Sequence, residues 1–351
     1  MNDKIRVMVV DDSVVIRRVL TETLGEDRRI EVVGTAANGE IALSKLPRLQ
    51  PDVITLDLEM PKMDGLTTLK ALRETDARLP VILFSSHTER GAAKTLEGLA
   101  AGASDYVTKP SGSPGLDATR EHIRETLLPK VLVLGRRTIQ REEISARPRP
   151  KGPVPVSLVV IGCSTGGPNA LAEVLPALPV PLRVPVLISQ HMLPTFTRTL
   201  AERLTARGPF PVEEARHGER LKPGQVWLAK GDTHLRLRPR GGDLLLDVWE
   251  GPPENSCRPS VDVMFRSAAE HFGAGTLAVV LTGMGRDGLK ACEALRELGA
   301  PILVQDEASS VVWGMPGQVA RAGLADEILP IEDIGPAIAK RLTGAAGGVA
   351  T

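Results

Sequence analysis

Aromatic residues are scarce in this chain, which has five Phe, three Trp and one Tyr among 351 residues. A surface that stacks nucleic-acid bases needs aromatic rings, so this scarcity argues against one and predicts cores built from aliphatic side chains. An excess of positive charge is also missing, because 43 Lys and Arg balance 43 Asp and Glu. The chain therefore lacks the basic field that attracts nucleic acid or anionic lipid, and no local basic patch replaces it.

Cysteine is limited to Cys163, Cys257 and Cys292, an odd number without a CxxC pair. This pattern argues against a disulfide framework and a zinc knuckle, and it fits a reducing cytoplasm. No run of about 18 apolar residues occurs, and two carboxylates interrupt the short apolar run near the N-terminus. We therefore expect a cytoplasmic protein that does not insert into a membrane. Because no coiled-coil heptads are present, we expect a monomer.

The alternation of apolar runs with helical patterns predicts two α/β domains. A chain of this length has room for about two domains. Near-continuous Val, Ile and Leu runs separated by helices are typical of a parallel sheet that is covered on both faces. We predict one doubly wound domain over 1–128, a flexible Arg- and Pro-rich linker over 129–153, and a second doubly wound domain with a parallel sheet over 154–345. The segment LPKVLVLG, at the start of this linker, is ambiguous.

Polar residues end the predicted strands of the first domain. Ligands bind parallel sheets at the carboxyl ends of the strands, where this sequence has Asp11 and Asp12, Asp57, Ser85 and Lys109. Facing carboxylates repel one another unless a hard cation holds them, so the set predicts a Mg²⁺ site. Asp57 is the central carboxylate and the candidate phosphoryl acceptor, which Lys109 and the Ser85 hydroxyl would assist. A single Asp would more simply be a helix N-cap, but the whole set argues against that alternative.

The motifs VVDDS, LDLEMPKMDG, FSS and GASDYVTKP resemble a response-regulator receiver domain over about residues 4–125. The resemblance implies a (βα)₅ fold and phosphorylation of Asp57 by a histidine kinase. It also implies that Asp12, Asp57 and the backbone carbonyl of Glu59 hold Mg²⁺, with Asp11 assisting. In the family's pattern Ser85 is the switch hydroxyl, Lys109 the conserved lysine and Tyr106 the rotating aromatic residue.

A possible nucleophile opens the second domain. The motif GCSTGGP lies between a predicted buried strand and a helix, and its G-x-S-x-G spacing exposes the Ser164 hydroxyl at a sharp turn beside helix N-terminal amides. A phosphate-binding loop is the alternative, although the motif lacks the Gly-Lys-Ser/Thr of a P-loop. Cys163 could also be the nucleophile, but it precedes the turn and is expected to point into the core.

A serine nucleophile needs a base and a group that orients the base. His191 ends the next predicted strand, so it should reach the same sheet edge as Ser164, whereas His234 in AKGDTHL is the main rival. Asp287 lies in the glycine-rich loop TGMGRDG after a later strand and could orient the base. Its alternative role is the N-cap of the helix that follows it. The order Ser164, His191, Asp287 differs from that of the α/β-hydrolases and the two other well-known triads.

The segments GCSTGGP, SQHM, RPSVDVMFRSAA, TGMGRDG and VVWGMPG resemble the catalytic domain of bacterial chemotaxis protein-glutamate methylesterases over roughly residues 154–340. The resemblance implies that Ser164 is the nucleophile, His191 the general base and Asp287 its orienter. The loops of Thr165 and Met284 would line the oxyanion site. Lys230 departs from the family's pattern, which has a proline at this position.

The two resemblances together imply a phosphorylation-controlled enzyme of chemotaxis. Its substrates would be glutamyl methyl esters and glutamines of chemoreceptors, its phosphodonor a histidine kinase, and its ester hydrolysis would need no cofactor besides the receiver's Mg²⁺. Two alternatives stay open: a non-enzymatic binding module that is switched by phosphorylation, and a hydrolase that acts on another ester or amide. A transcription factor is disfavoured because no basic recognition helix is present.

Overall fold

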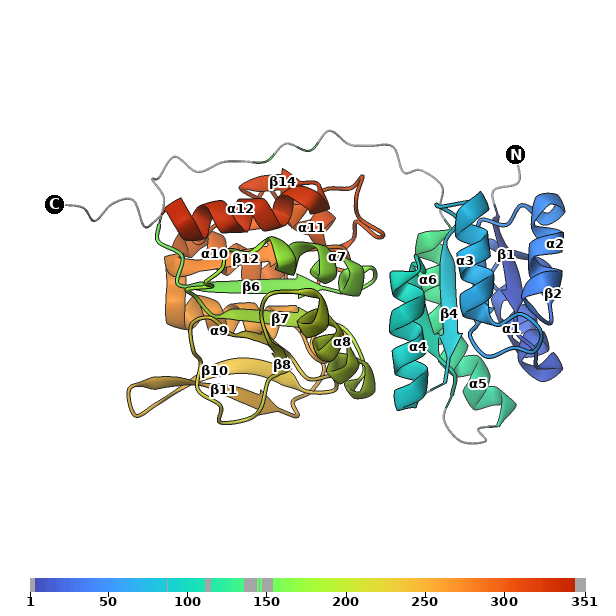
Figure 1. The fold of residues 1–351 in the computed structure, drawn as a ribbon, viewed down its shortest axis with the longest axis horizontal. Helices are drawn as coiled ribbons and strands as arrows, with labels where there is room; N and C mark the ends of the chain where they lie inside the picture. The colour runs from blue at the N-terminus through green and yellow to red at the C-terminus, as the bar shows by residue number, and fades with distance from the viewer. Residues whose placement is uncertain are drawn as a thin grey trace. The chain divides into compact units, whose positions relative to one another are not determined.

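The computed structural model describes residues 4–86, 88–110, 115–135 and 154–344, together with Ile144 and Ala146. The chain divides into two compact units between residues 142 and 143 (Figure 1). Each unit contains its own parallel sheet, as the sequence predicts. In the part of the chain that the structure describes, no helix combines the length and the apolar character that a membrane crossing requires.

The first unit has a five-stranded parallel sheet in the order β2-β1-β3-β4-β5. The expected (βα)₅ fold is therefore confirmed. Its central strands are almost completely buried because helices cover both faces. The strands are β1 (Ile5–Val10), β2 (Ile30–Ala36), β3 (Val53–Asp57), β4 (Val81–Ser85) and β5 (Asp105–Thr108).

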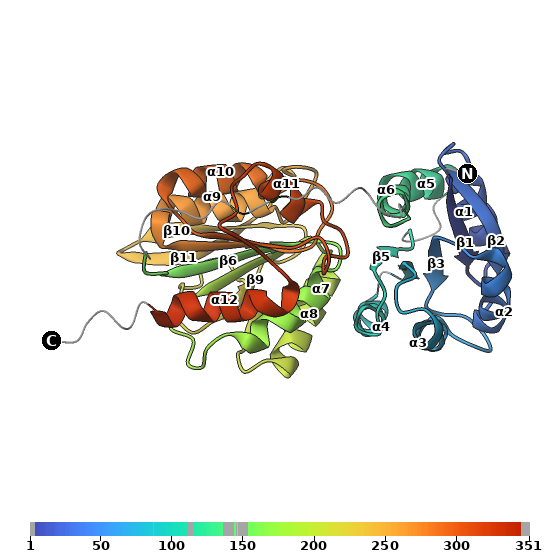
Figure 2. The same cartoon turned by 90° about the horizontal axis from the view of Figure 1, so that it is seen from above.

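Helices of the first unit begin at residues suited to capping. The side chains of Ser13, Asn38, Asp64 and Thr88 each accept a hydrogen bond from a backbone amide of the helix that they precede. In Figure 2 one group of helices lies above the sheet and another below it. The helices are α1 (Val14–Gly25), α2 (Gly39–Leu49), α3 (Gly65–Thr75), α4 (Glu89–Ala100), α5 (Leu116–His122), a π-helical turn (Ile123–Leu127) and α6 (Leu128–Leu134).

Helix α6 occupies the beginning of the segment that the sequence assigns to a linker. Val131 is completely buried and belongs to the core of the first unit, together with Ile123 and Leu127. Pro129 lies in the first turn of α6, directly after the π-helical turn. The first unit thus extends past the predicted boundary at residue 128. Apart from Ile144 and Ala146, residues 136–153 of the predicted linker lie outside the described residues.

The second unit has a seven-stranded parallel sheet in the order β14-β13-β12-β6-β7-β9-β8. The predicted doubly wound architecture is confirmed. The sequence pattern misses the two edge strands and an antiparallel hairpin, β10–β11. The strands are β6 (Leu158–Cys163), β7 (Val186–Gln190), β8 (Val212–Glu214), β9 (Val226–Leu228), β10 (His234–Arg240), β11 (Asp243–Trp249), β12 (Thr276–Val280), β13 (Ile302–Gln305) and β14 (Glu327–Leu329).

Helices cover both faces of the second sheet. Helices α9, α10 and α11 lie on one face, and α7, α8 and α12 lie on the other (Figure 2). Their bounds are α7 (Gly167–Val174), α8 (Pro194–Arg207), α9 (Val261–Phe272), α10 (Leu289–Leu298), α11 (Met315–Arg321) and α12 (Ile331–Gly344). Short 3₁₀ turns follow α7 at Leu175–Ala177 and α9 at Gly273–Gly275.

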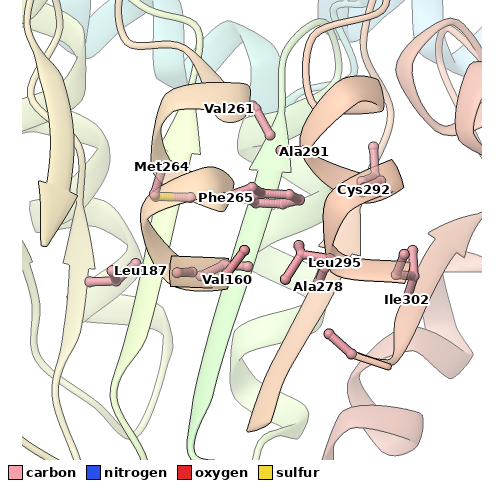
Figure 3. Close-up of a cluster of buried hydrophobic side chains, with 14 of the residues drawn as sticks. Val160, Leu187, Val261, Met264, Phe265, Ala278, Ala291, Cys292, Leu295 and Ile302 are labelled. Atoms are coloured by element: carbon pink, nitrogen blue, oxygen red, sulfur yellow. The ribbon is translucent and has the colours of Figure 1, made fainter. Parts of the chain in front are cut away.

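The core of the second unit fixes α9 and α10 on the sheet. Figure 3 shows side chains of both helices meeting over β6 and β12, with the ring of Phe265 among them. Phe265, Val160, Ala278 and Leu295 are completely buried. The core is mainly aliphatic, as the composition predicts. Because β6 and the starts of α9 and α10 carry the candidate site residues, this packing also positions the site.

We expect the substitution Phe265→Ala to lower the free energy of unfolding of the second unit by ~3–5 kcal/mol, since it removes buried area and leaves a cavity. The matched control is Phe272→Ala at the half-buried end of the same helix, which should cost clearly less. Urea unfolding followed by tryptophan fluorescence measures both, because all three Trp residues lie in the second unit. Equal losses for the two variants would contradict this account of the core.

Candidate active site

The acidic residues of the first unit gather at the carboxyl edge of its sheet. The carboxylates of Asp11, Asp12 and Asp57 offer oxygens that all lie within 4.8 Å of one another. Asp11 and Asp57 are buried, and Lys109 Nζ lies 2.7 Å from Asp57 Oδ2 and 3.3 Å from Asp11 Oδ2. The structure thus brings together the carboxylates and the lysine that the sequence predicts there.

Burial dominates the electrostatics of this pocket. It raises the pKa of Asp57 to about 6, even though the hydrogen bond and the charge of Lys109 act in the opposite direction. Burial also raises the pKa of Asp11, although Lys109 Nζ lies 3.3 Å from its Oδ2. A set of hard oxygen donors that repel one another fits Mg²⁺.

The predicted switch residues surround this pocket. Ser85 Oγ accepts a 2.6 Å hydrogen bond from Thr95 Oγ1 on α4. Tyr106 is buried, and Lys130 on α6 places its ammonium 5.4 Å from the centre of the tyrosine ring. Lys130 also donates to the Tyr106 carbonyl at 2.8 Å. Glu59 contributes its amide to Asp57 Oδ1 at 3.2 Å, while the metal-binding role of its carbonyl stays a prediction.

Ser164 and His191 follow adjacent strands of the second sheet. Cys163, the last residue of β6, is paired with Gln190, the last residue of β7, so the next residue of each strand reaches the same edge. The His191 amide donates to the Cys163 carbonyl at 3.2 Å, and Gln190 Nε2 donates to the Ser164 carbonyl at 3.0 Å. The register therefore places the serine beside the histidine.

Two glycines let the backbone turn and pack around Ser164. Gly166 has φ +80°, a left-handed conformation that allows the sharp turn into α7. A Cβ on Gly283 would lie 2.8 Å from Ser164 Cβ and 2.5 Å from Met315 Sδ. The loop after β12 therefore approaches the serine so closely that only glycine fits at position 283.

His191 is bound to a buried carboxylate. Its Nε2 lies 2.8 Å from Asp287 Oδ2, and the Asp287 side chain is 2% exposed. Burial alone would raise the pKa of Asp287, but the hydrogen bond and charge of His191, with the Val261 amide, hold it at about 2. Burial would lower the pKa of His191, but hydrogen bonds with Asp287 and Cys257 raise it to about 9. The carboxylate thus stabilises the imidazolium that forms when His191 accepts a proton.

Asp287 does not cap the helix that follows it. Gly288 is the N-cap residue of α10, and the Ala291 amide in the first turn of that helix donates to Asp262 Oδ1 at 2.8 Å. Asp287 instead accepts bonds at the start of α9, from the Val261 amide at 2.6 Å and Ser260 Oγ at 2.9 Å. Asn255 Nδ2 adds a further bond at 2.8 Å. The positive end of the α9 dipole supports the same charge.

Asn255 and Ser260 are functional candidates that the sequence reasoning missed. Asn255 Nδ2 also donates to Asp262 Oδ2 at 2.8 Å and so joins two buried carboxylates. A serine before an apolar helical pattern signals an N-cap, and Ser260 does cap α9 through the Val263 amide. No sequence signal marks Asn255, because its partners lie 7 and 32 residues away.

The rival residues have other roles. Both ring nitrogens of His234 face the backbone, with Nε2 at 3.0 Å from the Pro252 carbonyl and Nδ1 accepting from the Ser260 amide at 3.2 Å. Cys163 is completely buried, and burial raises the pKa of its thiol. These contacts favour His191 as the base and Ser164 as the nucleophile.

The loops of Thr165 and Met284 flank Ser164. The Thr165 carbonyl accepts a 2.9 Å bond from Thr282 Oγ1, which holds the serine loop against the loop after β12. Within the described residues, the Met284 amide makes no hydrogen bond. It is therefore available to an oxyanion.

The loop that carries Lys230 forms a closed turn despite its departure from the family's pattern. The amide and the hydroxyl of Thr233 both donate to the Lys230 carbonyl, at 3.3 and 2.8 Å.

Comparisons with known proteins agree with both resemblances. A family model described as "CheB methylesterase" matches residues 159–338, and one described as "Response regulator receiver domain" matches residues 7–120. The chain belongs to the CheB methylesterase family. A family member from Trichodesmium erythraeum, named protein-glutamate methylesterase/protein-glutamine glutaminase, is 46% identical over 97% of this chain and 99% of its own. One of the same name from Nocardioides sp. is 48% identical over 96% and 95% of the two chains.

A solved CheB structure supports the fold of the second unit. The methylesterase catalytic domain of Thermotoga maritima CheB is 40% identical and covers 53% of this chain and 99% of its own, with a TM-score of 0.52. The chain is thus a CheB family protein whose receiver domain precedes a methylesterase domain.

We expect Asn255→Ala to lower the free energy of unfolding by ~1–3 kcal/mol, because two buried carboxylates each lose a donor. The matched control is Ser256→Ala, an exposed position of the same turn. It shares the positive φ, 61° against 52°, and therefore the same backbone strain. Urea unfolding followed by tryptophan fluorescence compares the two variants. An equal effect at both positions would show that the carboxylate contacts contribute nothing.

Proposed function

We propose that this chain is a phosphorylation-activated serine hydrolase that demethylates glutamyl methyl esters and deamidates glutamines on chemoreceptors. The observation that carries the proposal is the 2.8 Å contact between His191 and the buried Asp287, at the sheet edge where Ser164 follows the neighbouring strand. The names of the CheB relatives support the choice of substrate. The absence of a transmembrane-type helix among the described residues is consistent with action from the cytoplasm.

The proposed reaction uses the two ring nitrogens of His191 in different ways. Nε2 donates to Asp287, so Nδ1 carries the lone pair that takes the proton of the Ser164 hydroxyl. Ser164 Oγ attacks the ester carbonyl carbon, and backbone amides of the Thr165 and Met284 loops bind the oxyanion. The bond to the methoxy oxygen then breaks, and His191 returns the proton to give methanol.

Hydrolysis of the acyl-enzyme completes the cycle. His191 takes a proton from water, the resulting hydroxide attacks the same carbonyl carbon, and glutamate leaves as Ser164 recovers its proton. Cys257 Sγ lies 3.5 Å from His191 Nδ1, so the proposed proton transfer requires the Ser164 hydroxyl to reach this nitrogen when substrate binds. Deamidation follows the same course with ammonia as the leaving group. The departure of the amine depends more strongly on protonation by His191 acting as the general acid. No cofactor takes part in this proposed step.

The first unit supplies the proposed regulation. Asp57 accepts the phosphoryl group from a histidine kinase, Lys109 binds the added charge, and Ser85 leaves Thr95 to donate to a phosphate oxygen. Asp11, Asp12, Asp57 and the Glu59 carbonyl would hold Mg²⁺, which neutralises phosphoryl charge when bound. Tyr106 then changes its rotamer as part of the switch.

Methanol release from methylated receptor membranes tests the proposal directly. We expect Ser164→Ala to abolish release, while Cys163→Ala retains it because Cys163 is buried away from the reaction. A small phosphodonor with Mg²⁺ should raise the rate of the wild type and of Asp117→Asn, an exposed control, but not of Asp57→Asn. Release that survives the loss of Ser164 would exclude the serine mechanism. No release from any form would favour another acyl substrate or a binding module.

The presence of both units in one chain leads to a second prediction. If the unphosphorylated first unit inhibits the second, a fragment without residues 1–150 should hydrolyse receptor esters faster than the unphosphorylated full chain. Cooperative unfolding in the tryptophan signal would show that the fragment is folded. A folded fragment with an unchanged or lower rate would contradict inhibition by the first unit.

A further inference from the structure

A thiol lies against the nitrogen of His191 that the proposed reaction needs free. Cys257 Sγ is 3.5 Å from His191 Nδ1, while Nε2 of the same ring is bound to Asp287. Cys257 is only partly buried, whereas Cys163 and Cys292 are completely buried. The hydrolytic cycle gives this thiol no role.

A tight turn holds Cys257 in this place. Glu254 and Cys257 exchange two backbone hydrogen bonds, at 2.9 and 3.1 Å, and the residues between them, Asn255 and Ser256, both have positive φ. Arg266 forms a bidentate pair with Glu254 at 2.6 and 2.7 Å. Since Asn255 is also bonded to Asp287, one carboxylate anchors both the turn with the thiol and the ring that the thiol faces.

The distance between the thiol and the ring nitrogen fits a shared metal ion. Zinc binds histidine nitrogen at ~2.0–2.1 Å and thiolate sulfur at ~2.3 Å, so a tetrahedral angle separates the two ligand atoms by roughly 3.6 Å. The observed separation is 3.5 Å. The ligand atoms of His191, Cys257 and Asp287 all lie within 4.8 Å of one another.

The carboxylate completes the pattern of a zinc-binding histidine. Such a histidine usually gives its other N–H to a carboxylate, which fixes the tautomer and makes the ligating nitrogen more basic. Asp287 occupies that position on His191 Nε2. The ring is therefore oriented with Nδ1 toward the thiol before any ion arrives.

We propose that His191 Nδ1 and Cys257 Sγ bind one zinc ion, which occupies the nitrogen of the base and reversibly inhibits hydrolysis. On binding, the thiol releases its proton to solvent, and so does Nδ1 wherever the His191 ring is protonated. A zinc–nitrogen and a zinc–sulfur bond form, and water fills the other positions. Nothing is oxidised or reduced. The inhibitory effect rests on the proposed function of His191, whereas the binding of zinc does not. The oxygen ligands of the first unit form a separate site that suits a harder cation.

Cobalt(II), a spectroscopic substitute for zinc, tests the binding in the full chain. Excess Mg²⁺ occupies the carboxylates of the first unit during the titration. We expect an absorption band of thiolate-to-cobalt charge transfer that zinc abolishes by displacement. Cys257→Ser should lose the band. His217→Asn, which removes the exposed histidine 3.0 Å from Asp247, should retain it. A wild-type chain without the band, or an undiminished band in Cys257→Ser, would overturn the site.

Methanol release tests the inhibition. Zinc should slow the wild type, and a chelator should restore its rate. In Cys257→Ser the zinc concentration for half inhibition should rise by at least ~10-fold, measured against that variant's own zinc-free rate. Tryptophan fluorescence checks that the variant is folded. Inhibition of the same strength in both proteins would overturn the inhibitory role. If no form releases methanol, the proposed function fails, and the cobalt band alone still decides the binding.

Discussion

One buried carboxylate of the second unit accepts hydrogen bonds from several separate segments of the chain. Asp287 is 2% exposed, and a carboxylate in that position is costly unless hydrogen-bond donors surround it. The donors come from separate segments: His191 after β7, Asn255 in a tight turn, and Ser260 and Val261 at the start of α9. Each donor is held in place by its hydrogen bond to the carboxylate. The geometry of the candidate site and the local stability therefore have the same physical origin.

Both units use the edge of a parallel sheet in the same way. Parallel strands in register end at one edge, so residues that follow different strands meet there although they are far apart in the sequence. In the first unit this rule brings Asp11 together with Asp57, and in the second it brings Ser164 beside His191. The helices pack on the faces of each sheet and leave this edge to polar side chains.

The same rule explains what could be predicted from the sequence. Buried strands are largely continuous apolar runs, so polar residues such as Asp57, Ser164 and His191 are visible at or just after the end of each run. Strands β8 and β14 have three residues each, and the glutamates in them, two in β8 and one in β14, leave no apolar run for a pattern to show. The hairpin β10–β11 carries exposed arginines on β10, which hides its strand character.

Contacts that depend on how a turn packs could not be predicted. The bonds from Asn255 to two carboxylates and the approach of Cys257 to His191 depend on how a turn packs against another segment, and no periodicity reports that. The role of Asp287 was ambiguous because a strand-end Asp before a helix fits a cap as well as an orienter. The start of the linker was ambiguous because Pro129 is compatible both with a linker and with the first turn of a helix.

The choice of ring nitrogen has a mechanical consequence. His191 presents Nε2, its outer nitrogen, to Asp287 and keeps Nδ1, the nitrogen next to Cγ, for the reaction that we propose. Nδ1 is only one ring bond from Cγ, the atom that joins the imidazole to Cβ. Rotation about the Cα–Cβ bond therefore displaces it less than it would displace Nε2. The register between β6 and β7 then sets the alignment of the proposed base with the proposed nucleophile. The sheet therefore holds the two residues in position.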